Sequence, residues 1–460
     1  MTQLTEAIAE FVTKSSLREV HPNVERVAKN AIIDCIGVTV PGTREDAGLI
    51  IQKYVKEVGG FPAASIIATN TRTTAPLAAL ANGVAAHVLD LDDTNMVLIG
   101  HPSVVLMPTV LAAGELAGAS GETILLGYIL GFEVMVKLAG VLNPEHYEHG
   151  WHATSTFGAL GAAAAASRIL GLSKEQTQRA LGLATSLAGG VRRNFGTMTK
   201  SFHAGNAARA GLESALLCQS GFTAHAEILD QTMGFMDIFG KASAEQRASI
   251  ADSLGNPYEL VSSGIDIKRY PCCGAMQAAI DAAIAIREAT DLSVEEIESI
   301  HCGENALGPE ILVYPFPQTP LEAKFSIEYG VCRALLDGRL GLEEFSEVKI
   351  KDPAIQEMLR KTRSFVHPEL KEVRQSEKDR SQQFPAIITA KLKDGTEITE
   401  KVYYAKGRWE NPLTEEEIFE KYRIYAGTHL SQKQVESSLN ILGRLEEMSN
   451  ISQLMTQLTG

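Results

Sequence analysis

The sequence contains few of the motifs by which common enzyme classes are recognised. No G-x-S-x-G and no G-x-G-x-x-G segment occurs among its 460 residues, so a serine-hydrolase elbow and a dinucleotide-binding turn both lack support. Aromatic residues are scarce at 6%, whereas alanine and glycine are abundant. This balance favours closely packed helices.

An excess of positive charge is also absent. The formal net charge is -14 at pH 7, which argues against a nucleic-acid partner. The same negative charge repels small anions at long range. An anionic substrate therefore has to be captured by a local group of lysine, arginine and histidine side chains, together with helix N-termini.

Cysteines with metal-ligand or redox spacing are absent as well. The six cysteines include no C-x-x-C pair, and Cys272 and Cys273, which are adjacent, are poorly placed for a mutual disulfide. We expect reduced thiols in a cytoplasmic protein. A thiol nucleophile at this pair is an alternative, but no catalytic triad can be assigned to it from the sequence.

Neither a secretory signal nor a membrane span is expected. Residues 1–12 carry two glutamates and no basic stretch. The most apolar segment, Ile124–Leu142, contains Glu133 and Lys137, which are four residues apart and can pair on one helix face. We therefore interpret this segment as a buried helix, and we expect no membrane partner.

Hydrophobic periodicity predicts a mainly α fold. From about residue 5 to residue 255, apolar residues recur at three- and four-residue spacing, which is the pattern of helices with a buried face. The clearest stretches are Val24–Val40, Ala75–Leu89, Val104–Leu116 and Gly158–Leu170. They predict one large all-helical domain.

The pattern changes after about residue 264. Two helices, a strand and a hairpin are expected there, at Gly274–Ala289, Ala323–Leu336, Ile297–Cys302, and Ala386–Leu392 with Thr396–Tyr404. Asp394-Gly395 suits the left-handed turn of the hairpin. Because the tail Thr414–Met455 is again helical, we predict a helical domain in two parts, residues 1–266 and 410–460. An α+β domain at 267–409 is inserted between them.

The first group of residues that can carry chemistry runs from His87 to Ser103. Between two apolar helices it gathers the polar residues Asp90, Asp92, Asp93, Thr94 and His101. His101 precedes Pro102, which is suited to the first turn of a helix. A helix N-terminus favours a neutral imidazole and a bound anion, as a general base beside a carboxylate requires. An acidic surface loop with a capping histidine is the alternative.

A second group, Glu145–Gly158, contains three histidines at three-residue spacing: His146, His149 and His152. This spacing suggests a metal site, and with it a metal-dependent hydrolase. However, Gly150-Trp151 interrupts any continuous helix, so the three imidazoles need not converge. We predict no metal here, and a catalytic His152 is weighed against solvated histidines.

Two further groups place basic residues near helix starts. Lys200 and His203 precede a helix of small residues, and Lys268 and Arg269 precede Pro271. A cation held at such a place can bind a substrate carboxylate. A solvated surface position is the alternative for each.

Taken in order, these groups resemble the motifs of the MmgE/PrpD superfamily. The matching strings are L-D-L-D-D-T, H-P-S, G-W-H, K-S-F-H-A-G-N-A-A and K-R-Y-P-C-C-G, at Leu89–Thr94, His101–Ser103, Gly150–His152, Lys200–Ala208 and Lys268–Gly274. Each string is weakly specific, but five in the same order over most of the chain are not expected by chance. The superfamily includes 2-methylcitrate dehydratase, cis-aconitate decarboxylase and iminodisuccinate epimerase.

The resemblance implies a large helical domain interrupted by a smaller α+β lid domain, with the active site between them. It also implies a homodimer that uses no metal and no organic cofactor. Carried over by motif, the catalytic residues are Asp90, His101, His152, Lys200 and Lys268. The substrate-binding residues carried over in the same way are Thr94, His203, Arg269 and Tyr314.

The implied reaction moves a proton at the carbon next to a carboxylate of a small di- or tricarboxylic acid. Lysines and helix N-termini bind the carboxylates, and the positive surroundings stabilise a carbanionic intermediate. Loss of hydroxide from this intermediate is dehydration, and reprotonation on its other face is epimerisation. Decarboxylation reaches the same kind of intermediate by loss of CO2. We expect a cofactor-independent lyase, with an epimerase of the iminodisuccinate type or a catalytically idle polycarboxylate-binding protein as alternatives.

Two departures bear on the branch of the superfamily. Asp92 follows Leu91, where the methylcitrate dehydratases have asparagine after an aromatic residue. Val104-Val105 follows the H-P-S motif, where those enzymes have Asp-Asn. The apolar pair is closer to the decarboxylases and to branches without an assigned activity.

Overall fold

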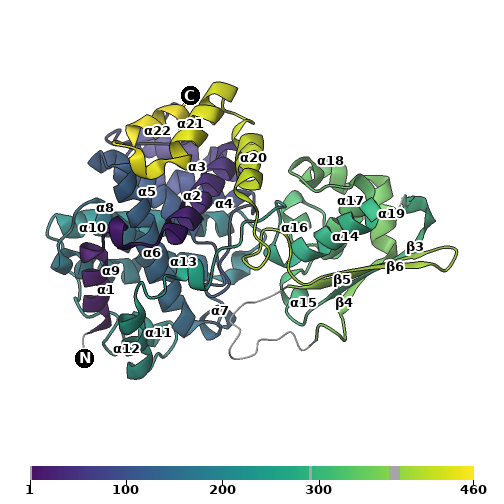
Figure 1. Cartoon of the computed structure of the whole chain (residues 1–460), viewed down its shortest axis with the longest axis horizontal. Coiled ribbons are helices and arrows are strands. Elements are labelled where there is room, and N and C mark those ends of the chain that lie inside the picture. The colour runs from purple at the N-terminus through teal and green to yellow at the C-terminus, as the bar shows by residue number, and fades with distance from the viewer. Residues whose placement is uncertain (1–2, 290–292, 372–383) are drawn as a thin grey trace. The chain divides into compact units, whose positions relative to one another are not determined.

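The chain folds into two compact units, described by a computed structural model for residues 3–289, 293–371 and 384–460. Unit 1 comprises Met1–Ile265 and Thr414–Gly460, and unit 2 comprises Asp266–Leu413. Both ends of the chain therefore belong to unit 1 (Figure 1). Helices dominate the described residues, so the predicted mainly α fold class is confirmed.

Unit 1 is built almost entirely from helices. Before the insertion these are α1 (Leu4–Lys14), α2 (Pro22–Gly42), α3 (Asp46–Val58), α4 (Ala75–Val88), α5 (Ser103–Ala117), α6 (Gly121–Leu142), α7 (Glu145–Glu148), α8 (Ala153–Ile169), α9 (Lys174–Leu187), α10 (Thr199–Gln219), α11 (Phe235–Ile238), α12 (Ala244–Ser253) and α13 (Glu259–Ser262). Two short strands, β1 (Ala64–Ser65) and β2 (Arg72–Thr73), pair antiparallel. Single 3₁₀ turns lie at η1 (Leu17–Glu19) and η2 (Arg192–Asn194).

The chain returns to unit 1 through three helices, α20 (Glu415–Ala426), α21 (Gln432–Gly443) and α22 (Ser452–Leu458), with η6 (Leu445–Glu447) between the last two. Capping boxes fix the starts of α20 and α21, where Thr414 and Ser431 each exchange hydrogen bonds with the residue three positions later. α20 packs along α2, so the two ends of the chain share one core (Figure 1). The helical tail expected from the sequence is thus confirmed.

The centre of unit 1 is a bundle of five helices. α10 packs against α4 and α8, and α8 packs in turn against α5 and α6. α6 is long and apolar enough to cross a membrane by length and composition, but 83% of its most apolar window is buried inside the protein. Its Lys137 and Glu133 pair at 3.7 Å, as expected for a buried helix of this pattern.

α4 and α10 approach each other closely because glycines meet where they cross. A Cβ added to Gly83 would lie 2.6 Å from the Cα of Gly205. A Cβ added to Gly205 would lie 2.3 Å from the carbonyl oxygen of Leu80. Both distances are far below van der Waals contact, so neither glycine can gain a side chain unless the two helices separate.

We expect Gly205→Ala to destabilise the protein by about 1–3 kcal/mol, which is the usual cost of overpacking a core. Urea unfolding followed by circular dichroism measures this loss. The matched control is Gly443→Ala at the end of α21, where an added Cβ meets nothing within 4 Å. Stability there should be unchanged or slightly higher, because alanine is the better helix former. Equal losses in the two variants would contradict the close crossing.

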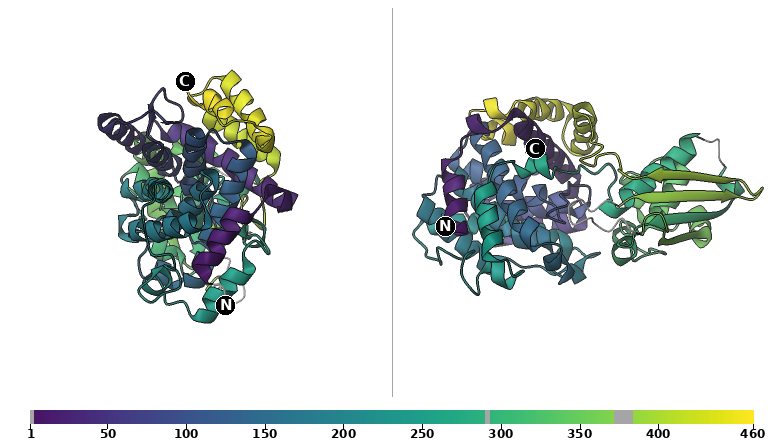
Figure 2. Two further views of the ribbon diagram at one scale, coloured as in Figure 1. Left: turned by 90° about the vertical axis from the view of Figure 1, so that its left-hand side faces the viewer. Right: turned by 60° about the horizontal axis from the view of Figure 1, so that its bottom comes forward.

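Unit 2 contains a four-stranded sheet with the order β4-β3-β5-β6. β3 (Ile297–Glu304) pairs parallel with β4 (Thr362–Val366) and antiparallel with β5 (Ala386–Leu392), which pairs antiparallel with β6 (Glu397–Val402). The longer helices, α14 (Gln277–Ala289), α17 (Ile327–Asp337) and α19 (Pro353–Lys361), pack on one face of this sheet (Figure 2). Short turns complete the unit at η3 (Gly274–Met276), η4 (Val294–Glu296), α15 (Gly308–Ile311), α16 (Pro320–Ala323), η5 (Glu343–Phe345) and α18 (Glu347–Ile350).

Most elements predicted for this segment are present, with two differences. The hairpin is confirmed, and Gly395 has the expected positive φ of 91°. The helix expected at Ala323–Leu336 is interrupted, because α16 ends at Ala323 and the Ser326 side chain caps a new helix by accepting from the N–H of Tyr329. Strand β4 and helix α19 were not predicted from the sequence.

Candidate active site

The polar residues of unit 1 gather around the loop between α4 and α5. His87 lies in the last turn of α4, and Asp90 follows that helix with a positive φ of 55°, a conformation that aspartate adopts more readily than most residues. The loop is closed by mutual backbone hydrogen bonds between Asn95 and Gly100. Gly100 permits close approach to α8, because a Cβ there would lie 2.8 Å from Oγ1 of Thr154.

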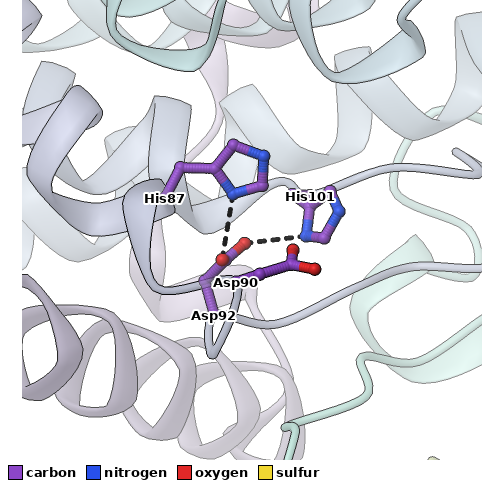
Figure 3. A group of neighbouring side chains, drawn as sticks. All are labelled: His87, Asp90, Asp92 and His101. Carbon is purple, nitrogen blue, oxygen red and sulfur yellow. Dashed lines mark hydrogen bonds and ion pairs between the residues drawn. The ribbon is translucent and has the colours of Figure 1, made fainter. Parts of the chain in front are cut away.

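Asp92 is fully buried between two histidines (Figure 3). Its Oδ1 lies 2.9 Å from Nδ1 of His87, and its Oδ2 lies 2.7 Å from Nδ1 of His101. Burial opposes ionisation of Asp92, but the interactions with the two imidazoles outweigh burial and hold its pKa well below the ordinary value. Asp92 is therefore a buried carboxylate anion at neutral pH.

His101 is oriented by two acceptors on the same ring nitrogen. Its Nδ1 is 3.0 Å from the carbonyl oxygen of Asp93, in addition to its contact with Asp92. Since both neighbours accept hydrogen bonds, Nδ1 carries a proton, and in the neutral imidazole Nε2 carries the lone pair. As predicted, His101 stands just before a helix, because α5 begins at Ser103. The side chain of His101 keeps 12% of its surface exposed, whereas those of His87 and Asp92 are fully enclosed.

Lys200 pairs with Asp90 at 2.7 Å, and both side chains are almost enclosed. The sequence placed Lys200 ahead of a helix, but α10 begins at Thr199, so Lys200 and His203 lie within its first turns. The Lys200 ammonium was expected to bind a substrate carboxylate. It already has a carboxylate partner within the protein, so a substrate anion must share this lysine with Asp90.

His152 and His203 contact each other through Nδ1 at 3.1 Å. Only one of the two nitrogens can donate in this contact, so the protonation of the two rings is coupled. Burial lowers the pKa of His203 to about 4, helped by the nearby Lys200 ammonium. Burial, with the same ammonium, holds the pKa of His152 well below its ordinary value. Both histidines are therefore neutral at pH 7.

The surroundings shift the pKa values of the neighbouring carboxyls Asp92 and Asp93 in opposite directions. Burial, reinforced by the charges of Asp92 and Asp34, raises the pKa of Asp93 well above its ordinary value. Asp93 hydrogen-bonds through its carboxyl with Ser103, whose hydroxyl also lies 2.6 Å from that of Tyr128.

The three evenly spaced histidines do not form a common site. His146 uses both ring nitrogens on other partners, the carbonyl oxygen of Phe239 at 2.8 Å and the hydroxyl of Thr156 at 2.7 Å. His149 is exposed, and His152 contacts His203. A hydrolase metal centre built on these histidines is therefore not supported.

A different group has the spacing of metal ligands within the described ranges. Potential ligand atoms of His87, Asp90, Asp92 and His101 all lie within 4.8 Å of one another. Their hydrogen bonds already account for this closeness, because Nδ1 of both histidines faces Asp92 and the Lys200 ammonium lies on Asp90. The prediction of a metal-independent site therefore stands as a prediction.

The other predicted site residues occupy different surroundings. Thr94 lies half-buried in the same loop as Asp90. Lys268, Arg269 and Tyr314 belong to unit 2, where Lys268 is buried and Tyr314 is half-buried after α15. Arg269 contacts Asp281 at 3.5 Å and lines an open pocket of about 600 Å³ within that unit. The convergence of Lys268 with His101 remains a prediction.

Sequence reasoning missed the contribution of His87. In the sequence His87 is only the first residue of the acidic motif, but in the structure its Nδ1 lies 2.9 Å from one carboxylate oxygen of Asp92. A usable signal was present, because His87 and Asn82 are the only strongly polar side chains in the otherwise apolar helix α4. A polar residue that is buried in such a helix needs a partner.

Comparisons with known proteins cover both units. The MmgE/PrpD N-terminal domain matches residues 6–247, and the MmgE/PrpD C-terminal domain matches residues 270–447. The chain is 30% identical to cis-aconitate decarboxylase of Mus musculus, over 100% of this chain and 94% of that protein. It is 30% identical to the Homo sapiens cis-aconitate decarboxylase, over 100% and 95%, and 25% identical to that of Aspergillus terreus, over 98% and 95%.

Proposed function

Because the chain belongs to the MmgE/PrpD family, we propose that it is a lyase that releases CO2 from cis-aconitate or a closely related unsaturated tricarboxylate. End-to-end similarity to decarboxylases from two mammals and a fungus supports this choice of reaction. The apolar pair Val104-Val105 after the H-P-S motif points to the same branch. The carrying observation is the environment of His101, whose Nδ1 lies 2.7 Å from the buried carboxylate of Asp92 and also contacts the carbonyl oxygen of Asp93, which leaves Nε2 for the substrate.

The chemistry requires a group that moves one proton and surroundings that stabilise negative charge. When the C–C bond to the departing carboxylate breaks, CO2 leaves and the electron pair stays on the carbon framework. There it delocalises into the neighbouring double bond and carboxylate. Delivery of one proton to carbon then completes the product, and His101 supplies that proton from Nε2 when it is charged. Lys200 and the start of α5 supply the nearby positive potential.

Histidines of low pKa suit the remainder of the site. His152 and His203 stay neutral at pH 7, so they donate and accept hydrogen bonds without adding charge. Asp92 stabilises the charged form of His101, because opposite charges at 2.7 Å favour ionisation of both. In this proposal His101 is thus the proton carrier, and the neutral pair binds and orients the substrate.

The test is an assay of CO2 release from cis-aconitate, with the organic product followed by proton NMR in D2O. One solvent deuteron should enter each product molecule at carbon. Loss of water from 2-methylcitrate without any CO2 release would contradict the assignment as a decarboxylase but would agree with a lyase. Isomerisation of iminodisuccinate alone would overturn the lyase. Tight binding of these acids without turnover would indicate an idle binding protein.

Chelators should leave this activity unchanged. We expect dialysis against EDTA, followed by assay in metal-free buffer, to retain full turnover, because hydrogen bonds and the Lys200 ammonium already occupy the carboxylates of the four-residue group. Elemental analysis of the dialysed protein serves as the control for metal content. Loss of activity that returns on adding Zn²⁺ or Mg²⁺ would show that His87, Asp90, Asp92 and His101 bind a metal instead.

A further inference from the structure

We propose that Asp92 is the positioning residue that sets the tautomer of His101. His87 in turn fixes the position of Asp92 by a hydrogen bond. Asp92 keeps the ring proton on Nδ1 and leaves Nε2 to exchange protons with the substrate. The inference rests on the proposed function for the reaction that His101 serves. The geometry on which it stands belongs to unit 1 alone.

Each oxygen of Asp92 is committed to one imidazole. Oδ1 accepts from His87 Nδ1 at 2.9 Å, and the charged Oδ2 lies 2.7 Å from His101 Nδ1 (Figure 3). An ionised carboxylate can only accept, so both histidines must present an N–H to it. The Asp93 carbonyl, 3.0 Å from the same His101 nitrogen, imposes the same requirement. A carboxylate attracts an N–H more strongly than a neutral carbonyl does, so Asp92 contributes most to the choice of tautomer.

His87 orients Asp92 without neutralising it. Burial lowers the pKa of His87 although Asp92 opposes this, so His87 donates a hydrogen bond as a neutral ring. Its second nitrogen, Nε2, is buried and has no hydrogen-bond partner within residues 3–289, 293–371 and 384–460. The negative charge of Asp92 therefore remains available to stabilise a proton on His101. The His87 and His101 rings also lie 4.4 Å apart between centroids, which restricts rotation of His101.

Other charged and titratable groups act on His101 in the same cluster. They come from the loop itself, from α8 and from α10, and they are Asp90, Asp93, His152 and Lys200. Asp92 differs from all of them because its carboxylate touches the ring nitrogen directly. Removal of the Asp92 carboxylate should therefore change both the tautomer and the titration midpoint of His101. Removal of a more distant group should leave both unchanged.

The experiment compares Asp92→Asn with Asp93→Asn in protein labelled with ¹⁵N-histidine. The His101 resonances are assigned by their loss in His101→Gln. In the wild-type protein we expect the Nδ1-protonated tautomer. In Asp92→Asn the new amide can donate to Nδ1, so the Nε2-protonated form should appear and the titration midpoint of His101 should move to lower pH. Asp93 contacts His101 through its backbone carbonyl and not through its side chain, so Asp93→Asn should keep the wild-type tautomer.

Turnover gives a second readout. Loss of the correct tautomer should lower kcat for cis-aconitate about ten-thousandfold, the size of loss known when an aspartate that orients a catalytic histidine becomes asparagine. The alkaline limb of the pH profile, where His101 loses the proton that it donates, should move to lower pH with the titration midpoint. The NMR readout needs no substrate, so absence of cis-aconitate turnover in the wild type would defeat the proposed function without touching this inference. A wild-type His101 protonated on Nε2, or a wild-type tautomer in Asp92→Asn, would overturn it, and the first result does not require the variant to fold.

Discussion

His101→Asn should lower the rate of proton transfer to and from the substrate by about a hundred- to ten-thousandfold, the usual contribution of a general acid–base group. Asparagine keeps an N–H donor near the place of Nδ1, so the hydrogen bond to Asp92 can persist while Nε2 is lost. The measurement is deuterium incorporation from D2O into the product formed from cis-aconitate. Wild-type exchange in His101→Asn would transfer the role to His152 or Lys200.

The choice of asparagine follows from the structure. The sequence treats His101 as a helix cap, for which substitution by alanine costs about 1 kcal/mol. Its contact with the buried Asp92 makes His101→Ala more damaging, because a buried anion loses a neighbouring imidazole at a cost of about 1–3 kcal/mol or more. Lys268→Ala is the contrasting variant. We expect it to weaken binding of cis-aconitate and raise KM, because it removes a carboxylate partner in ground and transition state alike.

Lys421→Met should destabilise the protein by about 3–5 kcal/mol, the cost of breaking a buried ion pair by removing one partner. The Lys421 ammonium lies 2.6 Å from Oδ1 of Asp34 and donates to the carbonyl oxygen of Leu91 at 3.0 Å. Asp34 is fully enclosed, so its negative charge stays buried in the variant after the Lys421 ammonium is lost. Activity should fall as well, because Leu91 stands between Asp90 and Asp92.

Urea unfolding of three variants tests this role of Lys421. The control Lys433→Met changes an exposed lysine of α21 and should alter stability by less than about 0.5 kcal/mol. The double variant Lys421→Met with Asp34→Asn removes both charges and should recover part of the loss. If Lys421→Met and Lys433→Met unfold at the same urea concentration, the buried pair contributes nothing to stability.

Elements with strong local signals were predictable from the sequence. The helices of unit 1 were found from apolar spacing, and the hairpin was found because Asp394-Gly395 marks its turn. Strand β4 was missed because it is only five residues long and pairs with β3, which lies far away in sequence. The break between α16 and α17 was missed because Ser326 acts as a cap inside a continuous helical pattern.

The residues of the candidate site were proposed from motifs, but the contacts among them could not be read from the sequence. Asp90, His101 and Lys200 were identified from motifs, yet nothing local specifies that Lys200 pairs with Asp90, 110 residues away. The loop also holds Ile99 at a φ of 50°, a conformation that a β-branched residue rarely adopts and that surrounding structure must impose. The contacts of Asp92 arise in the same way, from the meeting of helix and loop in three dimensions.

The hydrogen bond from Lys421 to the carbonyl oxygen of Leu91 determines when the site can be completed during synthesis. The two residues are 330 positions apart, and the whole of unit 2 is encoded between them. At a translation rate of about 5–20 residues per second, the ribosome needs roughly 15–65 s to pass from one to the other. Throughout this interval the acidic loop exists without its ammonium anchor. A nascent chain released before α20 emerges therefore carries every unit 1 histidine of the site, but it lacks the Lys421 contact that holds their loop.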